Sequence, residues 1–236
     1  MKSSRYRKGP SAKVKKPSSD SAIQLTEKYR PESWDDIAGQ ESICKTLSVF
    51  ESQNSLSGRA YWISGRSGCG KTSIARILAK KISDRWYTVE LDASELTAQF
   101  LKEIQDVFMY RPMSCQSRCY IVNEAHGLSK DQVRKLLKIT ESPCLNENMT
   151  WIFTTTLEGQ LTFEDGKQDA GPLLSRCVCL QLESEKSDDA MIHRLQNIAQ
   201  SESLDGKSLT EYKALFRDCN SNMRFALQKI ELGEML

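Results

Sequence analysis

The stretch Gly65-Arg-Ser-Gly-Cys-Gly-Lys71-Thr72 decides the fold of this chain of 236 residues. It matches the pattern G-x-x-x-x-G-K-[ST] at every fixed position. The apolar run Ala60–Ser64 precedes it, and apolar residues at helical spacing follow it at Ile74, Leu78 and Ile82. A strand, a glycine-rich loop and a helix in this order bring backbone N–H groups around a phosphate. We therefore predict a phosphate-binding loop inside an α/β domain.

The loop also predicts a ligand. Its glycines let successive N–H groups turn inward, and the helix that follows adds partial positive charge. Lys71 is expected to reach the β- and γ-phosphates of a nucleoside triphosphate, and the Thr72 hydroxyl to bind Mg²⁺. The residues expected to surround the phosphates are Gly65, Arg66, Ser67, Gly68, Cys69, Gly70, Lys71, Thr72 and Ser73.

Apolar runs on either side of helical patterns extend this fold. Four more runs predict strands, at residues 87–91, 119–122, 149–154 and 177–182. Strands that alternate with helices form a parallel sheet covered by helices on both faces. After residue 183 only helical spacing is present, in three segments that end on Ile198, Leu215 and Leu232. We predict a three-layer domain with a five-stranded parallel sheet over 23–183 and a small helical lid over 184–236.

The charge is unevenly distributed. The whole chain carries +2, but its first twenty residues hold seven Lys and Arg side chains against one Asp, which leaves −4 for the remainder. We read residues 1–22 as a basic flexible tail, which either contacts nucleic acid phosphates or is a solvated leader without a partner. No apolar run approaches the roughly 20 residues of a membrane span, so no membrane partner is expected.

A second candidate site follows the predicted strand at 119–122. It continues as Asn123-Glu124-Ala-His126. An acid at the carboxyl edge of the sheet, beside the phosphate loop, can activate water, and Glu124 fits that role. Asn123 stands where an aspartate normally assists Mg²⁺; its neutral amide predicts weaker metal affinity and weaker turnover. The candidate metal residues are thus Thr72 and Asn123, while His126 is expected to pack.

Further stretches carry a family resemblance. They are Leu25–Gln40, which contains Tyr-Arg-Pro; Glu124-Ala-His-Gly-Leu-Ser; Trp151-Ile-Phe-Thr-Thr-Thr156; Pro172-Leu-Leu-Ser-Arg176-Cys; and Cys219-Asn-Ser-Asn-Met-Arg224-Phe-Ala-Leu. In this order they resemble the AAA+ ATPases, and within them the clamp-loader group: replication factor C small subunits and the bacterial clamp-loader motor subunit. The resemblance covers residues 25–236 and implies ATP with Mg²⁺ as cofactors.

The resemblance also implies roles. Glu124 and Thr156, with Thr155 as second choice, would act on the attacking water and γ-phosphate. Arg224 would reach the γ-phosphate from the lid, and Arg176 would act as a finger on a neighbouring subunit's nucleotide. The residues implied to line the adenine pocket are Tyr29, Arg30, Pro31, Ile37 and Gly39.

The chain departs from the family at four places. Asn123 replaces an aspartate, the stretch between Thr156 and Ser175 is longer and more polar, and the zinc-binding insert of the bacterial subunits is missing. The sequence ends just after the lid, without the helical collar that holds clamp-loader pentamers together. Stable pentamer formation is therefore left open.

Three functions remain open from the sequence. The first is an ATPase that loads a sliding clamp on primed DNA with other AAA+ subunits or copies of itself, contacting DNA phosphates. The second is a nucleotide-binding, weakly hydrolysing structural subunit of a hetero-oligomer, which Asn123 favours. The third is another AAA+ DNA motor, such as a branch-migration engine. The expected location is the cytoplasm or nucleoid in a bacterium or virus, and the nucleus in a eukaryote.

Overall fold

The computed structural model describes residues 23–107, 112, 115, 117–141, 148–156, 171–182 and 188–236. The spacing of Phe100, Ile104 and Phe108 predicts a helix whose last position, Phe108, lies outside these residues. The basic tail expected at 1–22 and the polar stretch 157–170 also lie outside them.

Five strands form one parallel sheet: β1 (Ala60–Ser64), β2 (Thr88–Asp92), β3 (Arg118–Asn123), β4 (Met149–Thr155) and β5 (Cys177–Gln181). Their order is β2-β3-β4-β1-β5. The strand before the phosphate loop, β1, pairs with β4 on one side and β5 on the other. All carboxyl ends therefore meet at one edge of the sheet, which is where α/β proteins bind their ligands.

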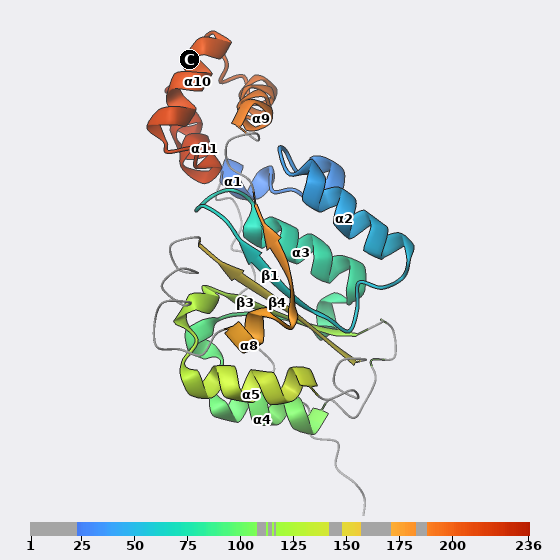
Figure 1. Ribbon diagram of the computed structural model, residues 1–236. Coiled ribbons are helices and arrows are strands. Elements are labelled where there is room, and N and C mark those ends of the chain that lie inside the picture. The colour runs from blue at the N-terminus through green and yellow to red at the C-terminus, as the bar shows by residue number, and fades with distance from the viewer. Residues whose placement is uncertain are drawn as a thin grey trace, which may run out of the picture.

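Helices cover both faces of the sheet (Figure 1). The helices and turns up to β3 are α1 (Leu25–Lys28), η1 (Trp34–Asp36), α2 (Glu41–Ser52), α3 (Lys71–Ile82), η2 (Arg85–Tyr87), η3 (Ala93–Glu95) and α4 (Ala98–Val107). Those between β3 and β5 are η4 (Ala125–Gly127), α5 (Lys130–Glu141) and α8 (Gly171–Leu174). This arrangement confirms the predicted three-layer, five-stranded parallel α/β fold.

The side chains of β1 alternate between two buried hydrophobic clusters. Tyr61 and Ile63 face α2 and α3 in one buried cluster, whereas Ala60 and Trp62 face α4 and α5 in another. Side chains of a strand point alternately to its two faces, so a strand whose five residues are all buried must be covered on both. The structure shows this pattern in β1, where every residue is buried.

Three helices follow the sheet: α9 (Asp188–Ser201), α10 (Leu209–Asp218) and α11 (Met223–Glu231). They gather above α1 and the carboxyl edge of the sheet (Figure 1). Leu195 of α9 and Tyr212 of α10 are fully buried and belong to the same cluster as the face of α3. We call these three helices the lid; the lid is therefore packed on the sheet region through a shared core.

Several predicted ends differ from the observed ones. Tyr87 was expected to begin a strand, but it closes η2, where its N–H donates to the Asp84 carbonyl at 2.9 Å. The strand β3 runs on to Asn123 because that residue still pairs with Asp92. Leu232 was expected on the buried side of the last helix and is instead 80% exposed, because α11 ends one residue before it.

The stretch Ser129-Lys-Asp-Gln predicts a capping box before α5, and the structure contains it. The Ser129 N–H donates to Gln132 Oε1 at 2.6 Å, and the Gln132 N–H donates to Ser129 Oγ at 3.4 Å. The side chain of Gln132 also donates to the backbone carbonyls of Ala93, which begins η3, and Leu96, which follows it. The cap therefore joins the start of α5 to η3. Within the described residues, no helix has both the length and the apolar character to cross a membrane.

Candidate functional site

A pocket opens at the carboxyl edge of the sheet. Its wall combines the phosphate loop, the ends of β2, β3 and β4, the segment after α1, and the lid helices α9 and α11. Apolar side chains line one part, namely Ile37, Ala38, Met191, Met223 and Leu227. Among the described residues of the wall, four are cationic and three acidic: Arg30, Lys71, Arg194, Arg224, Asp36, Asp92 and Glu124.

The phosphate loop has the conformation that its glycines allow. Gly68 has φ +75 and Gly70 φ +101, a left-handed region in which a side chain would be strained. The Lys71 ammonium donates to the carbonyls of Gly65 at 3.0 Å and Arg66 at 2.7 Å. The cation is thus held directly over the loop, at the position from which it can meet a phosphate.

Two neighbours hold the loop in place. A Cβ on Gly65 would lie 2.8 Å from Cys69 Sγ and 2.9 Å from Leu182 Cβ. A Cβ on Gly68 would lie 2.0 Å from Asn222 Oδ1, the residue that caps α11 by accepting from the Phe225 N–H. Burial raises the pKa of the Cys69 thiol, so no thiolate competes with a bound anion. The lid therefore rests on the loop itself.

The segment after α1 is tied to the lid by charge. The Tyr29 hydroxyl donates to Glu202 Oε1 at 2.5 Å, and Lys28 Nζ donates to the same oxygen at 2.6 Å. These two bonds hold the pKa of the Glu202 carboxyl below its usual range. Arg194 of α9 donates to the Tyr29 carbonyl at 3.2 Å. Tyr29 thereby joins the pocket wall both to α9 and to the residue that follows it.

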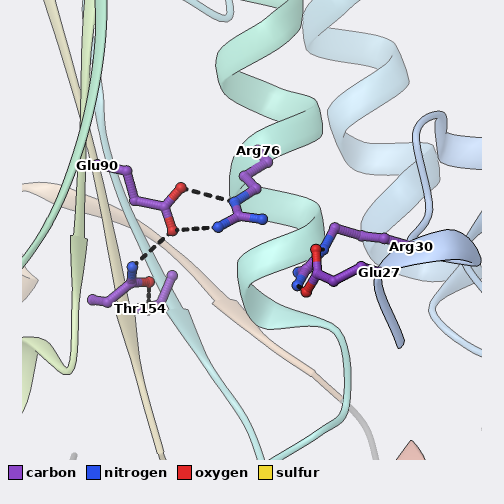
Figure 2. A network of polar contacts seen from close by, with 6 residues as sticks. Glu27, Arg30, Arg76, Glu90 and Thr154 are labelled. Atoms are coloured by element: carbon purple, nitrogen blue, oxygen red, sulfur yellow. Dashed lines mark hydrogen bonds and ion pairs between the residues drawn. The ribbon is translucent and has the colours of Figure 1, made fainter. Parts of the chain in front are cut away.

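A chain of polar contacts runs along the carboxyl edge. The Asn123 amide group donates to Glu90 Oε1 at 3.0 Å, and its carbonyl accepts from the Thr154 hydroxyl at 2.8 Å. Figure 2 shows the Glu90 carboxylate facing Arg76 of α3, with Thr154 below it and the Glu27–Arg30 ion pair close to the same helix. Three strands and α3 are connected in this way.

The acid after β3 has an unusual backbone. Glu124 has φ +50, which is left-handed for a residue other than glycine, and its carboxylate is 60% exposed. Its Oε2 lies 3.5 Å from Nδ1 of His126, and the same nitrogen lies 3.0 Å from the Thr155 hydroxyl. Such strained conformations persist where surrounding contacts enforce them, and they concentrate at functional sites. His126 thus links Glu124 to the end of β4.

Arg176 lies elsewhere. It precedes β5, whose first residue pairs with the first residue of β1, whereas the phosphate loop follows the last residue of β1. Five residues of strand separate these two levels, about 16 Å. The guanidinium donates to the Pro172 carbonyl and to Glu141 Oε1, each at 2.6 Å, and its side chain is 37% exposed. It is not part of the pocket wall.

Most sequence-predicted residues come together. Thr156, Glu124, Asn123 and Arg224 line the pocket, as do the following residues: Tyr29, Arg30, Pro31, Ile37, Ser67, Gly68, Cys69, Gly70, Lys71, Thr72 and Ser73. Gly39, Gly65, Arg66 and Arg176 do not line it. Gly39 has φ +75 and shapes the turn before α2, and Gly65 packs below the loop.

Sequence reasoning missed other residues of the wall. Arg194, Met191 and Leu227 come from the lid, and Asp92 and Thr154 end strands at the same edge. The strand ends carried a signal, because polar residues after buried strands gather where parallel strands end. The lid residues carried none beyond helical spacing, which predicts burial and not the surface that they face.

The residues present fit a nucleotide with a divalent cation. The cationic side chains and the loop N–H groups suit a polyphosphate, and the apolar part of the wall suits a planar base. Thr72 belongs to the wall and offers a hydroxyl oxygen to a metal ion. The Asn123 amide fits less well as a ligand because both of its ends bond within the protein.

Comparisons define the class of protein first. Residues 61–164 match the family model described as "ATPase family associated with various cellular activities (AAA)". A solved structure of the Thermotoga maritima RuvB Holliday junction branch migration motor superposes with a TM-score of 0.64 at 18% identity, covering 86% of this chain and 64% of that one. The central part of the chain is therefore similar to ATPases of the AAA family, and the chain has the P-loop fold of the superposed structure.

Sequence relatives then narrow the class. DNA polymerase III subunit gamma of Buchnera aphidicola (subsp. Acyrthosiphon pisum) is 28% identical over 234 residues, which is 88% of this chain and 60% of that protein. DNA polymerase III subunit tau of Escherichia coli K12 is 29% identical over 205 residues, 75% of this chain and 29% of that protein. The subunit gamma/tau of Mycobacterium tuberculosis H37Rv is 34% identical over 159 residues, 57% and 27% respectively.

These matches confirm the expected resemblance to the bacterial clamp-loader subunit. The chain spans from about a quarter to three fifths of the length of these relatives. The similarity thus covers only part of the length of each relative.

Proposed function

We propose that this chain is an ATP-binding and ATP-hydrolysing subunit of a clamp-loader-like assembly in DNA replication. One observation supports this above the others. Lys71, Glu124, Thr156 and Arg224 come from four separate segments of the chain and line the same pocket. Convergence of a phosphate loop, an acid, a hydroxyl and a second cation is what phosphoryl transfer to water needs.

Each residue has a task in the proposed reaction. Lys71 and the loop N–H groups hold the β- and γ-phosphates, and Arg224 approaches the γ-phosphate from the lid. Glu124 orients the attacking water, while Thr156 holds it in line. The Thr72 hydroxyl would hold a magnesium ion, which would supply positive charge beside the phosphates. The contact of Glu124 with His126 keeps the carboxylate near the end of β4.

Arg176 is proposed to complete the site of a neighbouring subunit. It stands one strand length away from its own phosphate loop and outside its own pocket, on an exposed face. An arginine supplied by a neighbour stabilises charge that develops during phosphoryl transfer. The proposed partners are thus other AAA+ subunits or copies of the chain, together with a sliding clamp and the phosphates of primed DNA.

The relatives support this set of partners because their names place them in a DNA polymerase. They are bacterial, which favours a cytoplasmic location over a nuclear one. We further propose the division into a tail at 1–22, an ATPase domain at 23–183 and a lid at 184–236. The likeness to RuvB is below 25% identity and supports the fold alone.

The proposal is tested by the change Glu124→Gln. We expect the wild-type protein to hydrolyse ATP and to do so faster with primed DNA. The variant keeps its affinity for ATP, but loses hydrolysis by about 10²–10⁴, the usual contribution of a residue that manages a proton or water. Steady-state phosphate release and titration calorimetry measure the two quantities.

The matched control is Glu103→Gln on α4, where Glu103 is exposed and accepts a hydrogen bond from Gln99 on the same helix. It should hydrolyse ATP like the wild type. Equal hydrolysis by Glu124→Gln and wild type would refute the role of Glu124, and no ATP binding by the wild type would refute the function.

A second function is favoured by one observation. Asn123 is neutral and engaged on both sides, so the metal site lacks the carboxylate expected there. Binding of ATP without turnover, even with primed DNA present, would indicate the weakly hydrolysing structural subunit instead of the active ATPase.

A further inference from the structure

The side chain of Asn123 makes one hydrogen bond as a donor and another as an acceptor. The side-chain amide donates to a carboxylate of β2 and accepts from a hydroxyl of β4. At neutral pH, where a carboxyl group is ionised and has no donor, an amide is the flat group of this size that carries both a donor and an acceptor. The position therefore uses both properties of asparagine, in opposite directions along the sheet edge.

An aspartate could make only one of these contacts. Its carboxylate has no donor when ionised, so it would accept from Thr154 and face the Glu90 carboxylate. The two like charges would stand about 3 Å apart, which disfavours ionisation of both. Glu90 itself is anchored: Arg76 Nε donates to Oε2 at 2.8 Å and Arg76 Nη2 donates to Oε1 at 3.1 Å.

The Arg76–Glu90 ion pair lies behind the residues that line the pocket. Arg76 and Glu90 do not line the pocket, whereas Asn123 and Thr154 do. The bond to Glu90 raises the pKa of Arg76, and Glu27 acts on the same guanidinium from α1. Asp92, which pairs with Asn123 across the strands, is a further acid at this edge. The charges behind the pocket thus fix which group suits position 123.

We propose that the Arg76–Glu90 pair selects an amide at position 123, and that Asn123 is a positioning residue for the Thr154 hydroxyl and the end of β4. The departure from aspartate is then compensated within this chain and is not a simple loss of a metal ligand. The effect of Asn123 on catalysis rests on the proposed function. The repulsion between carboxylates at positions 90 and 123 acts in the protein without nucleotide as well.

The first test is a double-variant cycle on the full chain without nucleotide. Asn123→Asp should lower the melting temperature by roughly 4–8 °C at about pH 7.5. Adding Glu90→Gln to the same chain should restore at least half of that loss, since the amide introduced at position 90 can donate to the carboxylate introduced at position 123. Differential scanning calorimetry gives both values.

The response to Glu90→Gln separates charge from packing. A loss of melting temperature in Asn123→Asp that Glu90→Gln leaves unchanged overturns the proposal.

A similar amide–carboxylate contact on the exposed surface provides a matched control. Gln99 Nε2 donates to Glu103 Oε1 at 3.0 Å on α4, where both residues are exposed. Gln99→Glu creates the same opposition of carboxylates under solvent screening, and should cost less than about 2 °C. If Asn123→Asp fails to fold, Glu90→Gln with Asn123→Asp must fold; failure of that protein as well overturns the proposal.

The second test concerns positioning. If Asn123 acts through Thr154, Asn123→Ala combined with Thr154→Val should hydrolyse ATP no more slowly than the slower single variant. Multiplied losses in kcat would overturn the positioning role. A wild-type protein that does not hydrolyse ATP would refute the proposed function while the stability cycle still decides the selection of the amide.

Discussion

At the carboxyl edge of the sheet, loops after β1, β3 and β4 meet the lid around one pocket. At the amino edge, Arg176 makes one ion pair and one backbone contact on an exposed surface. The first edge gathers cations and polar groups from distant segments around a pocket, whereas Arg176 at the second edge is exposed and lies outside that pocket. This difference agrees with the proposal that the carboxyl edge binds the nucleotide and that Arg176 acts on a neighbouring subunit.

Removing the Arg176 side chain at the amino edge should have the largest effect on ATP hydrolysis. Arg176→Ala is expected to bind ATP normally and to lose hydrolysis by about 10³–10⁵, the range for an arginine finger. Mixing it with Lys71→Ala should restore part of the activity, because an intact loop on one subunit meets an intact arginine on the next. Phosphate release by each variant and by the mixture measures this.

The control for the finger is Arg134→Ala, which removes an exposed arginine of α5 that lies 3.8 Å from Asp131. It should hydrolyse ATP like the wild type. If the mixture stays inactive under conditions in which the two variants co-assemble, Arg176 is structural or acts on its own subunit.

Removing the Lys71 side chain at the carboxyl edge should have the next largest effect, on ATP affinity. Lys71→Ala removes a cation that can make two charge-assisted bonds, so ATP affinity should fall roughly 10²–10⁴-fold. Titration calorimetry gives the dissociation constant. Lys80→Ala serves as the control, since Lys80 lies on the same helix but pairs with exposed Glu32. Unchanged affinity in Lys71→Ala would reject the site.

A smaller effect is expected where the carboxyl edge meets the lid. Tyr29→Phe removes the hydroxyl bond to Glu202 and should weaken ATP binding roughly two- to fivefold at about pH 7.5. The lowered pKa of Glu202 means that its bonds persist above the ordinary carboxyl pKa and are lost as the pH falls through the lowered value. The difference from wild type should vanish in acid.

Tyr87→Phe is the matched control, because Tyr87 lies under Arg118 and outside the pocket wall. Its ATP affinity should equal that of the wild type. A loss in Tyr29→Phe that is the same at every pH would show that the hydroxyl contributes without Glu202.

Local patterns predicted what local forces determine. The phosphate loop and the strand cores follow from residue types over short stretches of sequence, and so does the capping box at Ser129. Long-range contacts were beyond such patterns. The Glu90–Asn123 contact spans 33 positions and Arg194–Tyr29 spans 165, so no window of sequence contains both partners.

Asn123 illustrates this limit best. The sequence showed an amide where a carboxylate was expected, and predicted weaker magnesium binding. It did not show that Glu90 lies beside that amide, because the neighbours of a residue at a sheet edge depend on strand order. Leu232 was placed in the core because helical spacing continues past the point where α11 ends. The spacing of apolar residues does not by itself indicate where a helix ends.

The proposed role of Arg176 as a finger has a consequence for the number of complete sites in an assembly. A subunit that carries its pocket at one edge and its finger at the other joins its neighbours head to tail, with two different surfaces in each contact. In an open row of n such subunits, only n − 1 pockets receive a finger, and the terminal pocket stays incomplete. Closing the row into a ring would complete it. The activity per subunit therefore reports the length and closure of the assembly.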